Sequence, residues 1–316
     1  MLSRVADSVY WMSRYIERAD NVARFIDVNH NLTLGAAQGL DEQWEPLIHT
    51  TGDHELFADR YDTPSRDSVV RFLTFDRENP NSILSCFERA RENARTIREA
   101  ITSPMWEELN KFYHSVRRAA ESGTIVEQLH DFCDRVRLAS HLLAGVTDDT
   151  MSHTEAWHFS RIGRLVERAD KTSRIVDVQY YILLPNASDV GTSLDVIRWS
   201  ALLKSASALE MYRRTHGKIV PNNVADFLIL NRNFPRSIHF CLIRSHESIR
   251  EITGSAVGTF MNRAEQRLGR LRTEMDYTGI KDIIDFGLHE YIDTFQQRLN
   301  QVGDAVYQDF FVQNVQ

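Results

Sequence analysis

The first stretch of the chain has apolar residues at the steps expected of a long helix. They lie three and four residues apart, at Leu2, Val5, Val9, Met12, Ile16, Ala19, Ala23 and Ile26. Such steps place the side chains on one stripe at about 3.5 residues per turn. We therefore predict a bundle helix of roughly 38 Å whose apolar stripe is buried against other helices.

This helix has a second copy in the other half of the chain, with its apolar stripe at Phe159, Ile162, Val166, Ala169 and Val176. Residues 14–28 (RYIERADNVARFIDV) and 164–178 (RLVERADKTSRIVDV) are identical at 8 of 15 positions. Residues 75–99 match residues 230–254 at 9 of 25 positions, and residues 129–132 resemble residues 288–291. Because the matches keep the same order, we predict a tandem duplication. Residues 1–150 are the first helical repeat and residues 151–316 the second, packed together as one unit.

Residues that break helices are scarce in this chain. Glycine and proline number 14 and 7 among 316 residues, well below their usual combined share of about 12 %. No segment alternates apolar and polar residues over a sustained length, as a strand would. The sequence therefore predicts an all-α fold, a helical bundle of about ten helices built from two tandem related halves. Helices are expected to start at Asn79-Pro80 and Ser103-Pro104, and to end at Tyr180–Leu184 and His216-Gly217.

Charge and hydropathy narrow the range of partners and compartments. The net charge of −7 has the wrong sign for a general nucleic-acid binder. The longest purely apolar run, residues 180–184, is far shorter than the roughly 20 residues of a membrane span, and the chain begins without the apolar core of a signal peptide. The three widely spaced cysteines are expected to be buried thiols in a reducing compartment. We therefore predict a cytoplasmic protein that binds neither nucleic acid nor membrane.

The polar face of the repeated helix carries the same residue types in both copies. They are Arg14, Glu17, Arg18, Asp20, Arg24 and Asp27 in the first copy, and Arg164, Glu167, Arg168, Asp170, Arg174 and Asp177 in the second. Oppositely charged residues three or four apart contribute about 0.2–0.5 kcal/mol per exposed pair. One interpretation is therefore structural, an exposed salt-bridged face or pairs buried between the halves. The alternative is an anion- or substrate-binding site, because arginine beside a carboxylate suits partly buried, bidentate contacts.

Sequence motifs for nucleotide binding and for nucleophilic catalysis are absent. The chain contains no GxxxxGK[ST], GxGxxG or GxSxG. Two Glu-x-x-His steps, Glu127 to His130 and Glu155 to His158, are of the type that helical di-iron proteins use. About one such step is expected by chance, and the two lie at non-equivalent places in the repeat. We therefore predict no metal and no cofactor, and interpret His130 and His289 as structural histidines that pair with acids.

Five segments of the chain resemble the bacterial alpha-E family. These are residues 11–20 (WMSRYIERAD), 164–170 (RLVERAD), 198–203 (RWSALL), 234–238 (FPRSI) and 287–291 (GLHEY). The resemblance implies an all-helical protein encoded near a circularly permuted ATP-grasp protein and a transglutaminase-like protein. It also implies a role in making or modifying a peptide or amide. The family's motif residues fall on Glu17, Arg18, Glu167 and Arg168.

Taken together, these features favour an accessory or partner subunit of a cytosolic peptide- or amide-forming system. The chain is expected to act with the ATP-grasp ligase-like protein and to be non-catalytic itself. A first alternative is a helical carboxylate enzyme that uses Glu17 and Glu167, with or without a metal. A second alternative is a structural scaffold that binds no ligand.

Overall fold

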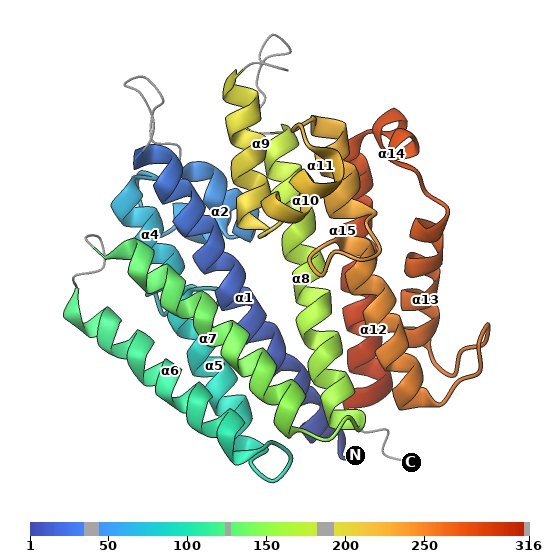
Figure 1. Cartoon of the computed structure of the whole chain (residues 1–316). Helices are drawn as coiled ribbons and strands as arrows, with labels where there is room; N and C mark the ends of the chain where they lie inside the picture. The colour runs from blue at the N-terminus through green and yellow to red at the C-terminus, as the bar shows by residue number, and fades with distance from the viewer. Residues whose placement is uncertain (35–43, 124–127, 182–192, 313–316) are drawn as a thin grey trace. The chain divides into compact units, whose positions relative to one another are not determined.

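The computed structural model describes residues 1–34, 44–123, 128–181 and 193–312. Within these ranges the backbone forms fifteen α-helices and one π-helical turn, and no β-strand (Figure 1). The predicted all-α fold is thereby confirmed. The helices outnumber the expected ten because short ones, such as α3 (His54–Ala58) and α14 (Ile280–Phe286), contain too few residues to show a periodic pattern.

Backbone contacts divide the chain into two compact units. The first unit comprises Trp11–Ser152, and the second comprises Met1–Tyr10 together with His153–Gln316. Helix α1 (Ser3–Leu34) therefore starts in the second unit and continues in the first.

In the first unit, six helices follow α1. They are α2 (Glu45–Thr51), α3, α4 (Arg66–Thr74), α5 (Ile83–Thr96), α6 (Ser103–Ser122) and α7 (Leu129–Thr150). The long helices pack in chain order, α5 against α6 and α6 against α7, while α4 contacts α2 and α5 (Figure 1). Side chains of α1 contact side chains of α7 and of the turn before α5, as described below.

The second unit contains a four-helix bundle with shorter helices around it. Its helices are α8 (Glu155–Tyr181), α9 (Ser193–Ser205), α10 (Leu209–His216), α11 (Pro221–Ile229), α12 (Ile238–Thr253), α13 (Arg263–Asp276), α14 and α15 (Leu288–Val306), followed by the π-helical turn Tyr307–Phe311. Helix α8 packs against α12 and α15, and α13 packs against the same two helices (Figure 1). These four contacts close a ring, which is the packing of a four-helix bundle.

Local sequence explains where several helices begin and end. The backbone of Thr102 is extended and its hydroxyl accepts a hydrogen bond from the Met105 amide, so α6 starts at Ser103 as predicted. Gly217 follows α10 with φ of +67°, which confirms the end predicted there. The helix expected at Asn79-Pro80 starts later, at Ile83, because the Asn79 side chain accepts from the Asn81 amide and forms a turn. The end predicted at Tyr180–Leu184 falls partly outside the described residues.

Most apolar residues of the two predicted stripes are buried. Trp44, Trp199, Phe72 and Phe227, aromatic residues at matching places of the two copies, are also almost completely inaccessible. Along the α1 stripe, Leu2 has 60 % of its surface exposed and Ile16 is half-buried. The 3.5-residue pattern therefore identifies the packed face correctly at the other six positions.

Helix α8 approaches the start of α1 within the second unit at a glycine. A Cβ atom built on Gly163 would lie 2.4 Å from the carbonyl oxygen of Tyr10. No real Cβ tolerates such a separation, so glycine at this position allows the two helix backbones to come close. This close contact positions the part of α8 just before Arg164, where the charged residues of the repeated face begin.

Candidate functional site

The polar face of α1 is buried in the structure. Glu17 is 1 % exposed, Asp20 0 %, Arg24 2 % and Asp27 4 %. The interpretation of this face as an exposed, salt-bridged surface is therefore wrong for these four residues. Periodicity did not reveal their burial, because it reports which side chains share a face and not how many faces are covered.

Asp20 and Arg24 form an ion pair one helical turn apart. Arg24 Nε donates to Asp20 Oδ2 at 2.9 Å, and Arg24 Nη2 lies 2.9 Å from His141 Nε2 on α7. Both members of the pair are buried, so the attraction is screened little and each charge depends on the other. The pair therefore also anchors α1 to α7.

Asp27 binds two side chains of α7. His130 Nδ1 lies 2.6 Å from Asp27 Oδ1, and Arg137 Nη1 lies 3.2 Å from Asp27 Oδ2. The hydrogen bond from Asp27 raises the pKa of His130, whose side chain is more than half exposed. A buried carboxylate thus orients an accessible imidazole, which confirms the prediction that His130 pairs with an acid. One turn further along α7, burial raises the pKa of the Cys133 thiol and makes it a poor nucleophile.

Glu17 and Arg18 contact different partners, although they are adjacent in sequence. Glu17 accepts a hydrogen bond from Asn21 Nδ2 at 3.1 Å, on its own helix. Arg18 Nη1 donates to Asn81 Oδ1 at 2.7 Å, in the turn before α5, and Asn81 donates in turn to Asp53. Arg18 therefore links α1 to that turn, while Glu17 remains in the buried row.

In the second unit the corresponding row lies on α8 and includes a lysine. Lys171 Nζ lies 3.1 Å from Asp170 Oδ2 and 3.8 Å from Glu167 Oε1, and Arg174 Nε lies 3.0 Å from Asp170 Oδ2. Burial alone would raise the pKa of Asp170, but the charges of Lys171 and Arg174 outweigh it and lower that pKa. These two acids and two bases therefore form one cluster of ion pairs.

The exposed end of this row also carries an aspartate–histidine pair. His289 Nδ1 on α15 lies 2.7 Å from Asp177 Oδ1, and this hydrogen bond raises the pKa of His289. Burial raises the pKa of Asp177 despite the neighbouring histidine. The pairing predicted for His289 is confirmed.

Near the other end of the row, Arg168 Nη1 donates to the carbonyl oxygen of Pro235, before α12, at 3.3 Å.

The structure places the ten predicted binding residues in two groups. Glu17, Arg18, Arg14, Asp20 and Arg24 lie on α1 in the first unit, and Glu167, Arg168, Arg164, Asp170 and Arg174 lie on α8 in the second. Arg14 and Arg164 are half-buried, and the Arg14 guanidinium lies 4.8 Å from the centre of the Trp11 ring. Within each unit the members of a group share one helix face.

Sequence reasoning missed the residues that approach these rows from other helices. His141, Arg137 and Asn81 are distant in sequence from α1, and no local pattern links them to it. Lys171 had a signal, because the repeat alignment places it opposite Asn21, directly after the four matching residues Glu-Arg-Ala-Asp. A cation buried beside two acids was therefore detectable in principle.

The metal-ligand pattern is not assembled in the described part of the chain. No group of three or more His, Cys, Asp or Glu side chains there is arranged to hold a metal ion. His130 is bound to Asp27, and burial lowers the pKa of His158. Glu127 lies outside the described residues, so its Glu-x-x-His step stays a prediction.

These observations define a class of protein: an all-helical protein with Glu–Arg pairs on two long helices. The chain matches the Alpha-E family model over residues 1–311, and that family is described as a predicted alpha-helical domain with a conserved ER motif. The chain therefore belongs to the Alpha-E family.

Curated relatives of this chain are longer than the chain itself. An uncharacterized protein of Mycobacterium bovis is 25 % identical over 295 residues, which cover 86 % of this chain and 32 % of that protein. Two uncharacterized proteins of Mycobacterium tuberculosis show the same identity and coverage. The chain thus spans about a third of the length of these relatives. No solved structure matches it significantly.

The hydropathy of the helices can be compared with the prediction that no segment of the chain spans a membrane. Among the described residues, no helix combines the length and the apolar character needed to cross a bilayer.

Proposed function

We infer that this chain is an accessory or partner subunit of a peptide- or amide-forming, or peptide-modifying, system. In this proposal it acts with an ATP-grasp ligase-like protein and, in the same system, a transglutaminase-like protein. The chain binds and orients an anionic group of its partner or of the partner's substrate, and the ligase performs the chemistry.

The observation that carries the proposal is the way each unit presents cations at the end of a buried charged row. Asp27 and Asp177 hold His130 and His289 by their Nδ1 atoms, and both imidazoles are accessible. Arg18 and Arg168 are partly accessible at the turns before α5 and α12. A carboxylate behind each accessible imidazole, together with a partly accessible arginine, is a suitable arrangement for positioning an anion, because the acids fix the imidazoles in place.

The length of the curated relatives supports a partner role. In those proteins the matching region makes up 32 % of the polypeptide, so it is covalently joined there to a much larger amount of other sequence. Regions that are joined in one polypeptide commonly work side by side. The ATP-grasp identity of the partner rests on the family resemblance alone.

The proposal includes the tandem duplication of residues 1–150 and 151–316. Its support is the order of the helices: α1, α2, α4, α5, α6 and α7 would correspond to α8, α9, α11, α12, α13 and α15. Ser82 and Ser237 cap α5 and α12 in the same way, each accepting from the amide three residues later. Under this proposal each unit supplies one Glu–Arg row.

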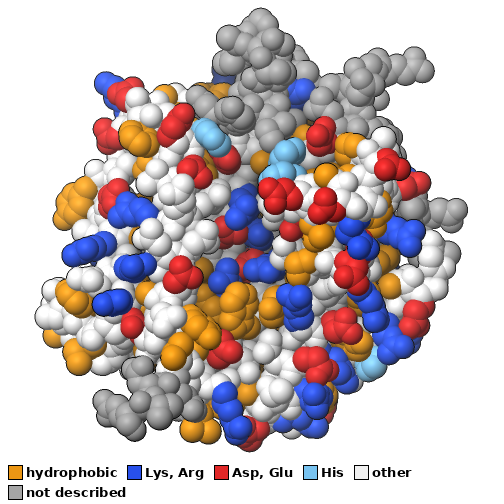
Figure 2. Space-filling model, turned by 180° about the vertical axis from the view of Figure 1, so that it is seen from behind, with side chains coloured by type: hydrophobic (Ala, Val, Ile, Leu, Met, Phe, Trp, Pro, Cys, Tyr) orange, Lys and Arg blue, Asp and Glu red, His pale blue; other side chains and the backbone are white. Residues whose placement is uncertain are grey.

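The proposed compartment is the cytoplasm, with no nucleic-acid partner. Cys86, Cys133 and Cys241 are buried thiols, as is usual for proteins of reducing compartments. On the face shown in Figure 2, acidic and basic side chains are interspersed and do not gather into the basic stripe of a nucleic-acid binder.

Co-purification and reconstitution test the proposal. The chain would be co-expressed with the ATP-grasp protein encoded beside it, the complex captured through a tag on the ligase, and ATP turnover measured with and without the chain. We expect a complex and a faster, substrate-dependent turnover in its presence. The variants Glu17→Gln and Glu167→Gln test the rows, with Glu121→Gln as control, because Glu121 is exposed and paired only with Arg117.

The outcomes separate the alternatives. Loss of ligase stimulation by either row variant, with the control unchanged, supports the proposal. Product formation by the chain without the ligase favours an enzyme in its own right. Absence of both complex formation and stimulation contradicts a partner role and favours a scaffold.

A further inference from the structure

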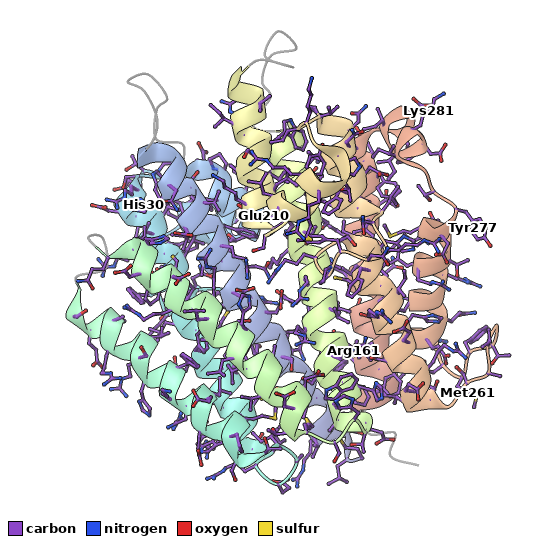
Figure 3. All side chains as sticks on the ribbon, viewed as in Figure 1. His30, Arg161, Glu210, Met261, Tyr277 and Lys281 are labelled. Atoms are coloured by element: carbon purple, nitrogen blue, oxygen red, sulfur yellow. The ribbon has the colours of Figure 1, made fainter. Side chains whose placement is uncertain are left out.

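The second unit contains a pocket that is separate from the Glu–Arg row. It lies between α12, α13 and the loop that joins them, residues 254–262, and has a volume of about 850 Å³. Tyr277 and Met261 lie just beyond the two ends of α13 (Figure 3), and Tyr277 lines the pocket. The equivalent connection in the first unit, residues 97–102, is shorter.

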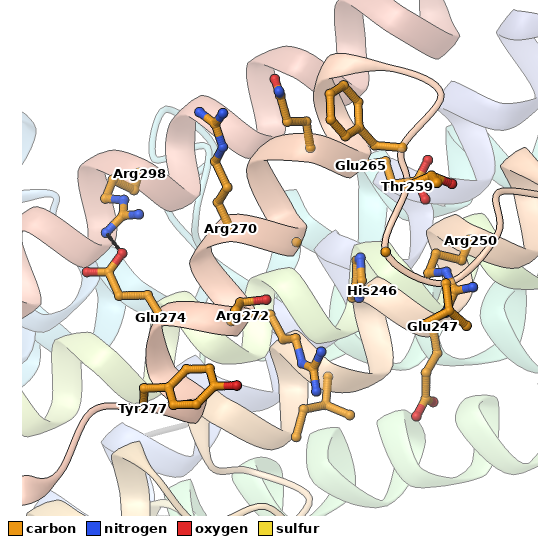
Figure 4. Close-up of a pocket in the computed structure, with 17 residues that line it drawn as sticks. His246, Glu247, Arg250, Thr259, Glu265, Arg270, Arg272, Glu274, Tyr277 and Arg298 are labelled. Atoms are coloured by element: carbon orange, nitrogen blue, oxygen red, sulfur yellow. Dashed lines mark ion pairs between the residues drawn. The ribbon is translucent and has the colours of Figure 1, made fainter.

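The acidic side chains around the pocket are already engaged. Glu265 is buried and accepts hydrogen bonds from the Met261 amide at 2.9 Å and from the Thr253 and Ser255 hydroxyls, which fastens the loop. Glu274 is paired with Arg298 at 2.5 Å, as the dashed line in Figure 4 marks. Glu247 is paired with Arg244, a residue outside the pocket lining. Glu274 and Glu247 are therefore paired with arginines other than Arg250 and Arg272, whereas Glu265 is held by neutral donors and keeps its charge in the pocket wall.

The cationic side chains, in contrast, have donors to spare. Arg250 Nη2 donates to the Ser255 carbonyl at 3.1 Å, and Arg272 Nη2 pairs with Asp276 at 3.0 Å. The Nε atoms of both arginines are buried, and neither has an acceptor among the described residues. An N–H group removed from water without an acceptor is unfavourable. A small rotation of either guanidinium toward a bound anion would satisfy it.

His246 lies between these two arginines (Figure 4). A Cβ atom on Gly269 of α13 would lie 3.0 Å from His246 Nε2, so the glycine leaves room for the imidazole. Its ring nitrogens have no hydrogen-bond partner in the described part of the chain. At the matching position of the first unit, Arg91 instead covers the Trp106 and Tyr113 rings, with its guanidinium 5.5 and 5.0 Å from their centres.

We propose that this pocket binds a phosphate or carboxylate group carried by a larger molecule with an apolar or aromatic portion. Arg250, Arg272 and His246 supply the donors for the anion, and the exposed Arg270 adds a further positive charge at the rim. Phe260, Tyr277 and Val257 offer apolar surface, and all three are strongly exposed. The pocket is much larger than one phosphate, so it has room for the rest of the ligand.

The electrostatics of His246 predict a signature of binding. Burial is the main cause that lowers the pKa of His246, and the charges of Arg272 and Arg250 lower it further, whereas Glu265 and Glu247 oppose them. The loop 254–262 contributes no charged residue. A bound anion would favour the protonated imidazole, so binding should take up a proton and strengthen as the pH falls toward the ordinary histidine pKa of about 6.5.

Isothermal titration calorimetry with four probes tests the proposal on the full chain. Phenyl phosphate and benzoate carry the two anionic groups on a ring, inorganic phosphate lacks the ring, and benzamide lacks the charge. We expect one or both ring-bearing anions to bind more tightly than inorganic phosphate and benzamide to show no binding. The better of the two anions identifies the chemistry of the natural ligand.

Variants locate the site. Arg250→Gln and Arg272→Gln should each raise the Kd by about tenfold or more, the loss expected for one charge-assisted contact. Arg117→Gln, an exposed arginine in the first unit, should leave the Kd unchanged. Where an arginine variant fails to fold, the NMR signals of His246 in the wild-type chain, assigned with His246→Gln, should shift on addition of the better anion. Absence of binding up to about 10 mM, an unchanged Kd in both arginine variants, or an unshifted His246 signal would overturn the proposal. None of these results depends on the Glu–Arg row, so the two proposals fail separately.

Discussion

Replacing Glu167 by glutamine removes one buried negative charge from α8 and keeps the size and shape of the side chain. Glu167 is fully buried, and Lys171 Nζ lies 3.8 Å from its Oε1 atom. At an effective dielectric constant of about 20, this attraction amounts to about 4 kcal/mol before any cost of desolvation. That value is the upper limit of what the substitution removes from this contact.

Two features of the cluster reduce the expected loss. Lys171 keeps its closer contact with Asp170, at 3.1 Å, where the attraction is about 5 kcal/mol on the same scale. The charge of Glu167 also repels that of Asp170, and the substitution removes this repulsion. We therefore expect Glu167→Gln to lower the free energy of unfolding by only about 1–2 kcal/mol. Asp170→Asn removes the negative charge that pairs with both Lys171 and Arg174 and should cost about 3–5 kcal/mol.

Urea unfolding followed by circular dichroism measures both losses, and the reconstituted ligase assay measures function. We expect Glu167→Gln to stay folded and to lose the stimulation of the ligase. Glu121→Gln should change the free energy of unfolding by no more than about 1 kcal/mol and the stimulated ligase rate by no more than the corresponding factor. If Glu167→Gln costs as much stability as Asp170→Asn, Glu167 is a structural counter-ion and the reasoning is refuted. Full stimulation by a folded Glu167→Gln variant would refute its role in binding.

Three further predictions concern the packing, the pH dependence and the metal content. Gly163→Ala should destabilise the chain by about 1–3 kcal/mol, because its Cβ would meet the Tyr10 carbonyl oxygen, whereas Gly145→Ala in α7, where nothing lies within 4 Å, should stabilise it by about 0.5–1 kcal/mol. Urea midpoints that shift in the same direction for both variants would contradict the close approach. Because the pKa of His130 is raised in the folded state, its contribution to stability should be complete below about pH 6.5 and lost as the pH rises through the folded-state pKa. The stability difference between the wild type and His130→Gln, measured from pH 5 to 9, should therefore shrink on the alkaline side; a constant difference argues against the Asp27 contact. Elemental analysis should find no stoichiometric iron, manganese or zinc, and one or two metals per chain lost on substitution of His130 or His158 would favour the enzyme alternative.

The sequence predicted the long helices and much of their packed faces, because both follow from periodicity within one segment. The burial of Asp20 and Arg24 was left open, since it depends on helices that are far away in the sequence. Arg137 and His141 could not be assigned to the row on α1 for the same physical reason.

The pocket of the second unit could not be predicted from the sequence either. Its lining residues come from α12, α13, α15 and a loop, and the loop differs in length from its counterpart in the first unit. Arg250 has an identical counterpart in the repeat alignment, Arg95, whereas His246 and the longer loop have none. His246 and Arg91 occupy matching positions, yet only a structure shows that one borders a cavity and the other covers two aromatic rings.

The charges in the two rows give a reason to treat each row as one electrostatic unit. In the first unit, Asp20 contacts Arg24 and Asp27 contacts Arg137, which comes from α7, while Glu17 lies in the same buried row. In the second unit, the three corresponding carboxylates are accompanied by Arg174 and Lys171, and the latter comes from α8 itself.

The repeat alignment shows that the second cation has changed helix. Asn21 stands where the second unit has Lys171, and Gln296 stands where the first unit has Arg137. A permanent cation besides Arg24 or Arg174 thus contacts each row, although its position differs. His130 and His289 contact the aspartate at the end of each row, and this contact raises the pKa of both histidines. A buried charge is costly unless it is compensated, so protonation of an accessible histidine, or its contact with a partner, acts on the balance of the whole row.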